Sequence, residues 1–508
     1  MWMGRRLLLA LLAVGALAWP AGATWSILIV DRRTGEVAVG GATCLATTNL
    51  LAVIPAVAVG RGAGCIQSRA DTPSLVRLYD QLVLGSDPAT VLAVVKAGLN
   101  NPGVFQIGVV ALDGAPVTFT GNGAGEASDG VAGEVGDLAY AIQGNLMTGP
   151  AVWLDAEAAL LGTPGDLATK LMAAMEAARA AGGDGRCSCN LGMPEDCGAP
   201  PPSFEKSAHC GFVVVARMGD VDSACVVGPD CANGSYHLKL NVKGADARPS
   251  SPDPVLQLRD RFDEWRASLA GEPDGVLSRV TTVQSLPADG TTSRSVTVRL
   301  SDIEGTPLAG GGDAVTVATL GGGPALASVS PVVDHGDGTY TFELTAGTTP
   351  GTDRFVVSAL AGGRRIHLYP YLEVRTDPVR PLHVGYDQVS VAEAPAVPFV
   401  LNVPSNANGA FIVLASLSGT VPGTAVGSVL VPLNRDALTW STLLRAGDPS
   451  VLPGTIGFLD ANGRAEAELV LGPRQMLALA GLHLDWAGLV LGGSAPLATN
   501  AVGFDLVP

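Results

Sequence analysis

Apolar positions in the first half of the chain recur with two periods, one typical of strands and one typical of helices. Residues 24–30 and 36–42 are apolar runs around a turn at 31–35, which predicts a β-hairpin. Further strands are predicted at 53–59, 104–112, 117–120, 212–217 and 236–242. Helical spacing marks 74–84, 88–97, 151–161, 165–181 and 253–270, and Asp87 is placed to cap the second of these. Strands, then helices, then strands again indicate an α+β domain.

Helical spacing nearly disappears after Gly271. Short alternating strands with Gly, Asp and Thr turns run from 280 to 374 and predict a β-sandwich. A second β-rich module follows, with strand-like runs such as 411–417 and 465–471. For 508 residues, this pattern predicts three domains after the N-terminal segment, which we place at 24–271, 275–376 and 378–508.

The N-terminal segment has the pattern of a signal peptide. Arg5 and Arg6 precede an apolar stretch at 7–17 that is too short to span a bilayer. Small residues at 21–23 offer a cleavage site that leaves Thr24 first, and a competing site at 16–18 leaves Trp19 first. We expect residues 1–23 to be removed and the protein to be secreted or extracytoplasmic. No later apolar run is both long enough and free enough of Gly, Pro and charged residues to cross a bilayer, so no membrane span is expected.

Composition narrows the function classes. Hydrophobic residues make up 47% and charged residues 15% of the chain, so each domain can build a core. The net charge of −16 repels phosphates, which argues against a nucleic-acid partner. The chain lacks a phosphate-binding Gly-rich loop with Lys and a His-Glu-x-x-His helix, and we expect no cofactor.

All eight cysteines fall in the first predicted domain, which in an exported chain indicates disulfides. They are Cys44, Cys65, Cys187, Cys189, Cys197, Cys210, Cys225 and Cys231. Cys225 and Cys231 are close enough to close one loop, but the overall pairing stays open. Zinc is the weaker alternative, because Cys187-x-Cys189 lacks the spacing of a zinc knuckle and no His pair accompanies it.

The first domain lacks the usual signatures of nucleophilic catalysis. It has no Gly-x-Ser-x-Gly elbow, and its two histidines, His209 and His237, are expected to be structural. Signal cleavage suggests another route, because an N-terminal Thr24 would carry its own base. The pKa of a free α-amine is about 7.7–8.0, so near neutral pH this amine can accept the proton of the threonine hydroxyl. The alternative is that Thr24 merely begins a strand.

Four motifs occur in an order that resembles a known bacterial family. They are Thr24-Trp25-Ser26-Ile27, Gln143-Gly144-Asn145, Ala181-Gly182-Gly183-Asp184 and Asp253-Pro254-x-x-x-Leu258-Arg259. Together they resemble the family called domain of unknown function 1028, over residues 24–269. The resemblance implies a four-layer αββα sandwich of the N-terminal-nucleophile (Ntn) hydrolase type, with a near-N-terminal Thr that matches Thr24.

The resemblance also implies roles for individual residues. Thr24 would be the nucleophile and, through its amine, the base. Asn145, with the backbone of Gly144, would donate hydrogen bonds to an oxyanion; a turn role for Asn145 is the alternative. Gln67 matches a family Gln after a strand and could bind substrate.

Two further residues, Asp184 and Arg186, could pair and orient the site, or form a purely structural ion pair. The chain departs from the family at two places. Cys44 stands where the family often has Lys or His after the second strand, and it is expected to form a disulfide. The segment 187–205 is inserted before Ser207 and could cover the site. Both departures argue against catalytic activity, but neither argues against the predicted fold.

The second predicted domain resembles the invasin/intimin type of bacterial immunoglobulin-like repeat. The resemblance rests on Pro287-Ala288-Asp289-Gly290, Ser295-Val296-Thr297-Val298 and Asp334-x-Gly336-Asp337-Gly338-Thr339-Tyr340. The last motif lacks the spaced carboxylates of a calcium loop, which favours a hairpin turn. Such modules are spacers or adhesive stalks.

The leading hypothesis is therefore a secreted Ntn-type amidohydrolase that acts on a small amide or peptide. Peptides of the cell envelope are candidate substrates by location, and the C-terminal β domains could attach the protein to the cell surface. The alternative is a catalytically silent surface protein that binds or adheres, and a third hypothesis is a structural surface-layer component.

Overall fold

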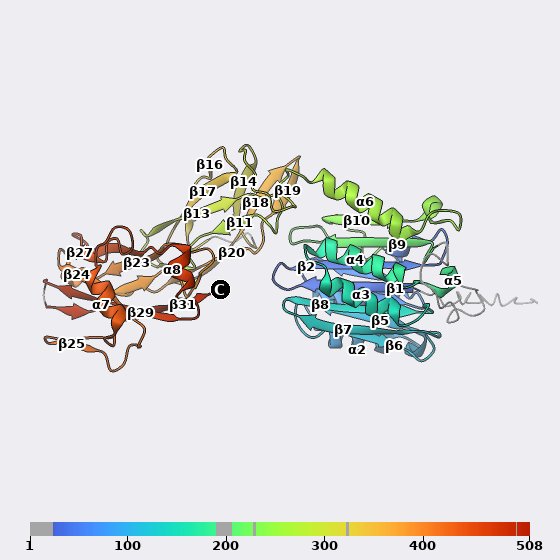
Figure 1. The fold of residues 1–508 in the computed structure, drawn as a ribbon, viewed down its shortest axis with the longest axis horizontal. Coiled ribbons are helices and arrows are strands. Elements are labelled where there is room, and N and C mark those ends of the chain that lie inside the picture. Colours follow the sequence, from blue (N-terminus) through green and yellow to red (C-terminus); the bar gives the residue numbers. More distant parts are fainter. Residues whose placement is uncertain (1–23, 189–205, 227–229, 322–324, 494) are drawn as a thin grey trace, which may run out of the picture. The chain divides into compact units, whose positions relative to one another are not determined.

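The computed structural model describes residues 24–188, 206–226, 230–321, 325–493 and 495–508 (Figure 1). The predicted signal peptide and residues 189–205 of the predicted insertion 187–205 lie outside the described residues. The chain divides into two compact units, Met1–Leu269 and Ala270–Pro508. Among the described residues, no helix combines the length and the apolar character needed to cross a lipid bilayer.

The first unit contains a six-stranded antiparallel sheet, which we call sheet one. Its order is β10 (Leu238–Val242), β9 (Cys210–Ala216), β2 (Glu36–Thr43), β1 (Thr24–Asp31), β8 (Leu138–Asn145) and β7 (Asp129–Val135). The predicted hairpin is confirmed, because β1 and β2 pair from Thr24 opposite Thr43 to Asp31 opposite Glu36. All but the last residue of β1 is buried, as expected of a central strand covered on both faces.

A second antiparallel sheet, sheet two, packs against sheet one through contacts of β1 and β8 with β4 and β5. Its order is β3 (Pro55–Ala58), β4 (Gly62–Gln67), β5 (Gln106–Ala111) and β6 (Val117–Thr120). Helices α3 (Ala151–Gly162) and α4 (Leu167–Ala180) cover the outer face of sheet one (Figure 1), and α6 (Pro254–Ser268) packs on β9 and β10. Helices α1 (Thr72–Val83) and α2 (Pro88–Gly98) contact sheet two. The unit is thus layered as helices, sheet, sheet and helices.

Aspartates begin the helices α1, α2, α4 and α6 of this unit, whereas α3 begins after Pro150 without a side-chain cap. The predicted cap is confirmed, since the Asp87 carboxylate accepts hydrogen bonds from the backbone N–H groups of Ala89 and Thr90 at the start of α2. Asp71, Asp166 and Asp253 cap α1, α4 and α6 in the same way. Each carboxylate satisfies N–H groups that have no partner inside the helix.

The second unit consists mainly of strands. Its first part has one sheet of β11 (Arg279–Thr281), β13 (Ser293–Arg299), β17 (Thr339–Thr345), β15 (Ser328–Val329) and β16 (Val333–Asp334). The other sheet there contains β12 (Ser285–Pro287), β20 (Leu372–Asp377), β18 (Gly351–Ala361), β14 (Ala314–Thr319) and β19 (Arg364–His367). The hairpin predicted at 334–339 is confirmed: β16 pairs with β17, and the Thr339 backbone N–H donates to the Asp337 carboxylate.

The C-terminal part contains three more sheets. The first sheet contains β21 (Leu382–Val384), β23 (Val397–Asn402) and β28 (Arg464–Leu469). The second contains β22 (Gln388–Ser390), β31 (Val502–Val507), β29 (His483–Leu491), β24 (Ala410–Ser416), β27 (Ile456–Phe458) and β30 (Leu497–Ala498). The third is the hairpin of β25 (Thr424–Val426) and β26 (Val429–Val431). The sequence did not predict two helices here, α7 (Ala437–Leu444) and α8 (Pro473–Leu477).

Candidate active site

Three strand ends meet where β1 begins. Thr24, the first residue of β1, lies opposite Thr43 at the end of β2 and opposite Asn145 at the end of β8. Directly opposed residues of antiparallel strands project their side chains from the same face of the sheet. The side chains of Thr24, Thr43 and Asn145 therefore form one row across three adjacent strands.

This row faces sheet two. Alternate residues of a strand share a face, so Thr24 projects to the same side as Leu28. A Cβ atom placed on Gly108 of β5 would lie 2.9 Å from Leu28 Cδ1, which puts Leu28 against sheet two. The opposite face of sheet one meets α4, where a Cβ on Gly40 would lie 3.0 Å from Leu171. Thr24 therefore lies between the two sheets, at the end of a central strand, and is 3% exposed.

Two buried glutamines tie the start of β1 to sheet two. Gln67, the last residue of β4, donates from Nε2 to the Thr24 carbonyl at 2.8 Å and to Gln106 Oε1 at 2.7 Å. Gln106 Nε2 in turn lies 2.9 Å from the Gly144 carbonyl of β8. The amide predicted to bind substrate thus holds the backbone of the predicted nucleophile. Gln106 was not predicted, although a polar residue in an apolar strand is a visible signal.

Asn145 is the last residue of β8 and is fully buried. Its Nδ2 donates to the Ala124 carbonyl at 3.4 Å, which is long for a hydrogen bond. The residues after Asn145 are hydrogen-bonded to the segment of the Gly-Gly-Asp motif. The Gly185 N–H donates to the Leu146 carbonyl at 3.0 Å, and Met147 forms an antiparallel β-bridge with Asp184. Two motifs far apart in the sequence are therefore neighbours.

The fully buried Asp184 and the partly buried Arg186 form an ion pair at the end of β2. The Asp184 carboxylate lies 2.9 Å from an Arg186 guanidinium nitrogen and accepts a 2.7 Å hydrogen bond from the Cys44 N–H. Arg186 also donates to Thr43 Oγ1 at 3.4 Å. Burial raises the pKa of Asp184, and the Arg186 charge and the Cys44 N–H partly oppose that shift. The pair stands one strand away from Thr24.

A glycine lets the 182–184 segment approach sheet one. Gly183 has a φ of +63°, and a Cβ there would lie 2.7 Å from Ser207 Cβ and 2.8 Å from the Trp25 ring. Any other residue would be strained and would collide with both neighbours. Gly183 thus sets the position of Asp184.

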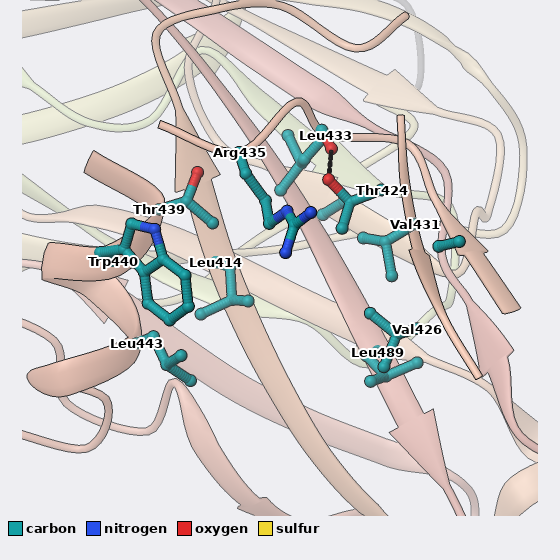
Figure 2. Close-up of a pocket in the computed structure, with 12 residues that line it drawn as sticks. Leu414, Thr424, Val426, Val431, Leu433, Arg435, Thr439, Trp440, Leu443 and Leu489 are labelled. Carbon is teal, nitrogen blue, oxygen red and sulfur yellow. Dashed lines mark hydrogen bonds between the residues drawn. The ribbon is translucent and has the colours of Figure 1, made fainter. Parts of the chain in front are cut away.

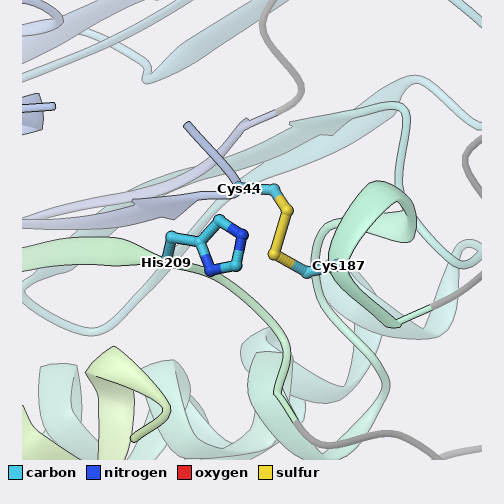
Figure 3. A group of neighbouring side chains, drawn as sticks. All are labelled: Cys44, Cys187 and His209. Atoms are coloured by element: carbon cyan, nitrogen blue, oxygen red, sulfur yellow. A yellow bond between two sulfur atoms is a disulfide. The ribbon is translucent and has the colours of Figure 1, made fainter. Parts of the chain in front are cut away.

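Cys44 forms a disulfide with Cys187, with a Cα–Cα distance of 5.6 Å, as the sequence predicted for Cys44. This bond fastens the short helix α5 (Gly185–Ser188), which carries Arg186, to the end of β2. His209 lies beside the disulfide (Figure 3), with the two sulfurs and a ring nitrogen all within 4.8 Å of one another. In the disulfide the sulfurs are not thiolates, so this group is not a zinc site as it stands.

The loop closure between Cys225 and Cys231 is also confirmed. The prediction was wrong for Cys65 and Cys210, which are free, buried thiols. Cys65 lies within β4, and Cys210 lies at the start of β9, where its Sγ is 3.3 Å from the Leu45 carbonyl. Burial in these strands raises the pKa of both thiols to about 12, so both stay protonated and unreactive. Cys189 and Cys197 lie outside the described residues.

The structure therefore gathers Thr24, Asn145, Gly144 and Gln67 around one end of β1. Asp184 and Arg186 are joined to the same end through Thr43 and Cys44. Of the two histidines, the burial of His209 together with Lys206 and Arg186 lowers its pKa to about 4. His237 packs edge-on against Trp265, with ring centroids 5.1 Å apart.

Comparison with known proteins agrees with both resemblances. The chain combines an N-terminal α+β unit with a region made mainly of strands, whose first part resembles an invasin domain. Residues 24–192 match the Family of unknown function (DUF1028), and residues 275–367 match Invasin, domain 3. No curated protein matches the chain.

Solved structures of both kinds are similar to parts of this chain. A DUF1028 protein from Silicibacter pomeroyi shares 16% identity over 48% of this chain and 88% of its own, with a TM-score of 0.34. The Yersinia pseudotuberculosis adhesin InvE shares 19% identity over 45% and 58%, with a TM-score of 0.17. The Escherichia coli adhesin FdeC shares 12% identity over 94% and 96%, with a TM-score of 0.19. The disulfides and the invasin-like region are typical of extracellular or surface proteins.

Proposed function

We propose that the first unit is an Ntn-type amidohydrolase that becomes active when the signal peptide is cleaved after Ala23. The observation that carries this proposal is the position of Thr24 between two sheets, opposite Asn145 and with its carbonyl held by Gln67. The layered order of helices, sheet, sheet and helices supports an Ntn-hydrolase-like sandwich, the fold that the family resemblance implies.

Cleavage after Ala23 would convert the Thr24 nitrogen from an amide into an amine. That amine titrates near pH 7.7–8.0, at roughly neutral pH, and can take the proton of the Thr24 hydroxyl. Oγ then attacks the carbonyl carbon of an amide, and the carbonyl oxygen becomes an oxyanion. The amine returns the proton to the leaving nitrogen as the C–N bond breaks. Water hydrolyses the resulting ester and restores the hydroxyl.

Asn145 is the candidate oxyanion donor. Its side chain lies in the same row as Thr24, and its long 3.4 Å hydrogen bond to Ala124 is weak enough for a developing negative charge to displace. Arg186 supplies a cation near the end of β2, where the family's Lys or His is replaced by Cys44. Its hydrogen bond to Thr43 places the guanidinium next to the row, and because the Asp184 carboxylate offsets its charge, its role would be to orient the row.

The requirement for a free α-amine gives the sharpest test. Periodate cleaves the 1,2-amino alcohol of an N-terminal threonine and leaves an aldehyde that a hydrazide labels. We expect protein purified from exporting cells and then denatured to be labelled, and its intact mass to begin at Thr24. Thr24→Ser should still be labelled and Thr24→Ala should not. A chain that begins at Trp19, or one that gives no label, would exclude this mechanism.

A second function, binding or adhesion at a cell surface, is favoured by the match of residues 275–367 to Invasin, domain 3. Here the second unit would attach the first to a surface. Fractionation of exporting cells tests it: the full chain should stay with the envelope, and a chain ending at Leu269 should appear in the medium. Equal release of both chains would contradict attachment through the second unit.

A further inference from the structure

The second unit contains a pocket of about 240 Å³ near its C-terminal end. The hairpin of β25 and β26 forms one wall, α7 forms another, and strands β24 and β29 form the floor (Figure 2). Pockets that bind small ligands are concave and mostly apolar in this way, although drug-sized ligands use volumes of about 300 Å³ and above. This pocket therefore suits a smaller or partly protruding ligand.

The pocket is lined mainly by aliphatic and aromatic carbon. Leu414 and Leu489 form the floor, and Val431 and Leu433 belong to a small hydrophobic cluster separate from the main core of the unit. At the rim, Trp440 is 53% exposed. Large apolar side chains at the mouth of a concave surface leave water in contact with carbon, and an apolar ligand would displace that water.

The polar side-chain groups of the lining are the hydroxyls of Thr424 and Thr439, the indole N–H of Trp440 and the Arg435 guanidinium. Both threonine hydroxyls are already used: Thr424 donates to the Leu433 carbonyl at 2.7 Å, and Thr439 lies 3.2 Å from the Asn434 carbonyl. The pocket therefore offers a ligand one charged group, the Arg435 guanidinium, and one neutral donor, the Trp440 N–H.

Arg435 makes no ion pair and no side-chain hydrogen bond with any described residue. The adjacent carboxylate of Asp436 is engaged elsewhere, because it accepts the backbone N–H groups of Leu417 at 2.6 Å and Thr439 at 2.9 Å. These hydrogen bonds lower the pKa of Asp436 to about 2. Figure 2 shows the Arg435 guanidinium directed toward the centre of the ring of labelled side chains.

From this arrangement we propose that the pocket binds a small amphiphilic carboxylate, a free medium-chain fatty acid. The carboxylate lies against Arg435, where a guanidinium fork matches its two oxygens. The hydrocarbon chain lies over Leu414, Val431 and Leu489 and is covered at the mouth by Trp440. The site is independent of the chemistry proposed for Thr24.

Other ligand classes fit this lining less well. A sugar would bring several hydroxyls to a pocket with one charged group and one neutral donor, and a peptide would bring N–H and C=O groups that lose their hydrogen bonds with water. A cationic amphiphile would be repelled by Arg435. A neutral one would fill the pocket and leave the guanidinium partly desolvated and unpaired.

Calorimetric titration of the full chain tests the proposal with three probes: decanoate, decanol and decyltrimethylammonium, each below the concentration at which it aggregates. We expect saturable binding of decanoate with a stoichiometry of one, weaker binding of decanol, and no binding of the cation. Decanoate affinity should fall with added salt, because Arg435 is exposed.

Two variants and two controls locate the site. Arg435→Gln should weaken decanoate binding about tenfold and remove the preference for decanoate over decanol, as expected for loss of a charge-assisted hydrogen bond. Val426→Trp should abolish binding, because Val426 is a lining residue, 45% exposed, on the same face of β25 as Thr424, and its enlargement fills the pocket without disturbing the core. Arg474→Gln makes the same charge change on an exposed residue outside the lining, and it should bind as the wild type does. Thr24→Ala should also bind normally.

Three results would overturn the proposal. The first is the absence of saturable decanoate binding. The second is equal affinity for decanoate and decanol in the wild type, which would indicate an apolar cavity that does not recognise carboxylates. The third is undiminished binding by Val426→Trp when its unfolding temperature equals that of the wild type, which would place the ligand elsewhere.

Discussion

The end of β1 in the first unit and the pocket in the second unit hold their polar groups in opposite ways. At β1, Gln106 and Asp184 are fully buried, and each is hydrogen-bonded to other segments of the chain. In the pocket, Arg435 stands among apolar side chains without a partner among the described residues. Groups fixed in advance suit chemistry, because no reorganisation is needed when charge develops. A single unpaired charge beside apolar carbon suits binding, because the ligand supplies the opposite charge.

The largest expected effect follows from removal of the Thr24 hydroxyl. A peptide epoxyketone reacts with both the amine and the hydroxyl of an N-terminal threonine, and the adduct is detected by mass. We expect mature wild type to form the adduct, Thr24→Ser to form it more slowly, and Thr24→Ala to lose at least about a thousandfold in rate. Reaction of Thr24→Ala at the wild-type rate would show that the fixed polar groups around β1 serve structure alone.

Asp184→Ala should give the largest loss of stability. It would leave the Arg186 charge half-buried and the Cys44 N–H without its acceptor, at a cost of about 3 kcal/mol in the free energy of unfolding of the first unit. Urea denaturation measures this loss. The matched control is Asp263→Ala, whose carboxylate pairs with Arg259 on the surface and should contribute less than about 0.5 kcal/mol. Similar losses of stability in the two variants would contradict the inference that the Asp184 hydrogen bonds hold the site in place.

Gln106→Leu should have a smaller effect. The substitution keeps most of the side-chain volume but removes the donor to the Gly144 carbonyl and the acceptor for Gln67. We expect a loss of about 1–3 kcal/mol in the free energy of unfolding, the range for buried groups left unsatisfied. Gln257→Leu is the control, because its amide bonds carbonyls at the exposed surface and should change stability by less than about 0.5 kcal/mol. No difference between the two would indicate that water replaces the lost partner.

His209 should produce the smallest effect, visible in the dependence of stability on pH. Its pKa is lowered from 6.5 to about 4 by burial and by Lys206 and Arg186. Between these values the unfolded chain binds more protons than the folded one, so stability is fully present above pH 6.5 and falls as the pH drops toward 4. His209→Gln should flatten that part of the profile, measured as unfolding temperature against pH. An unchanged slope would exclude His209 as its source.

Strong local signals made much of the fold predictable. The first hairpin, the capped helix α2 and the turn between β16 and β17 depend on residues close in sequence, and all three were predicted correctly. Strand β4 was missed because Gly62–Gln67 carries two glycines and little β-branched character. It is a strand because β3 and β5 pair with it on either side, which local propensity does not encode.

The sequence by itself named Thr24, Asn145, Gln67, Asp184 and Arg186, through the expected signal cleavage and the family motifs. Only the tertiary structure decided that they meet, because antiparallel register places Thr24 opposite Asn145 and a disulfide fastens Arg186 beside β2. It also decided that Cys65 and Cys210 stay free and that Gln106 supports the site. The pocket around Arg435 has no local signature, because the segments that line it are apolar or ordinary when taken singly. A cavity is a property of how elements pack, and the chain order does not record that packing.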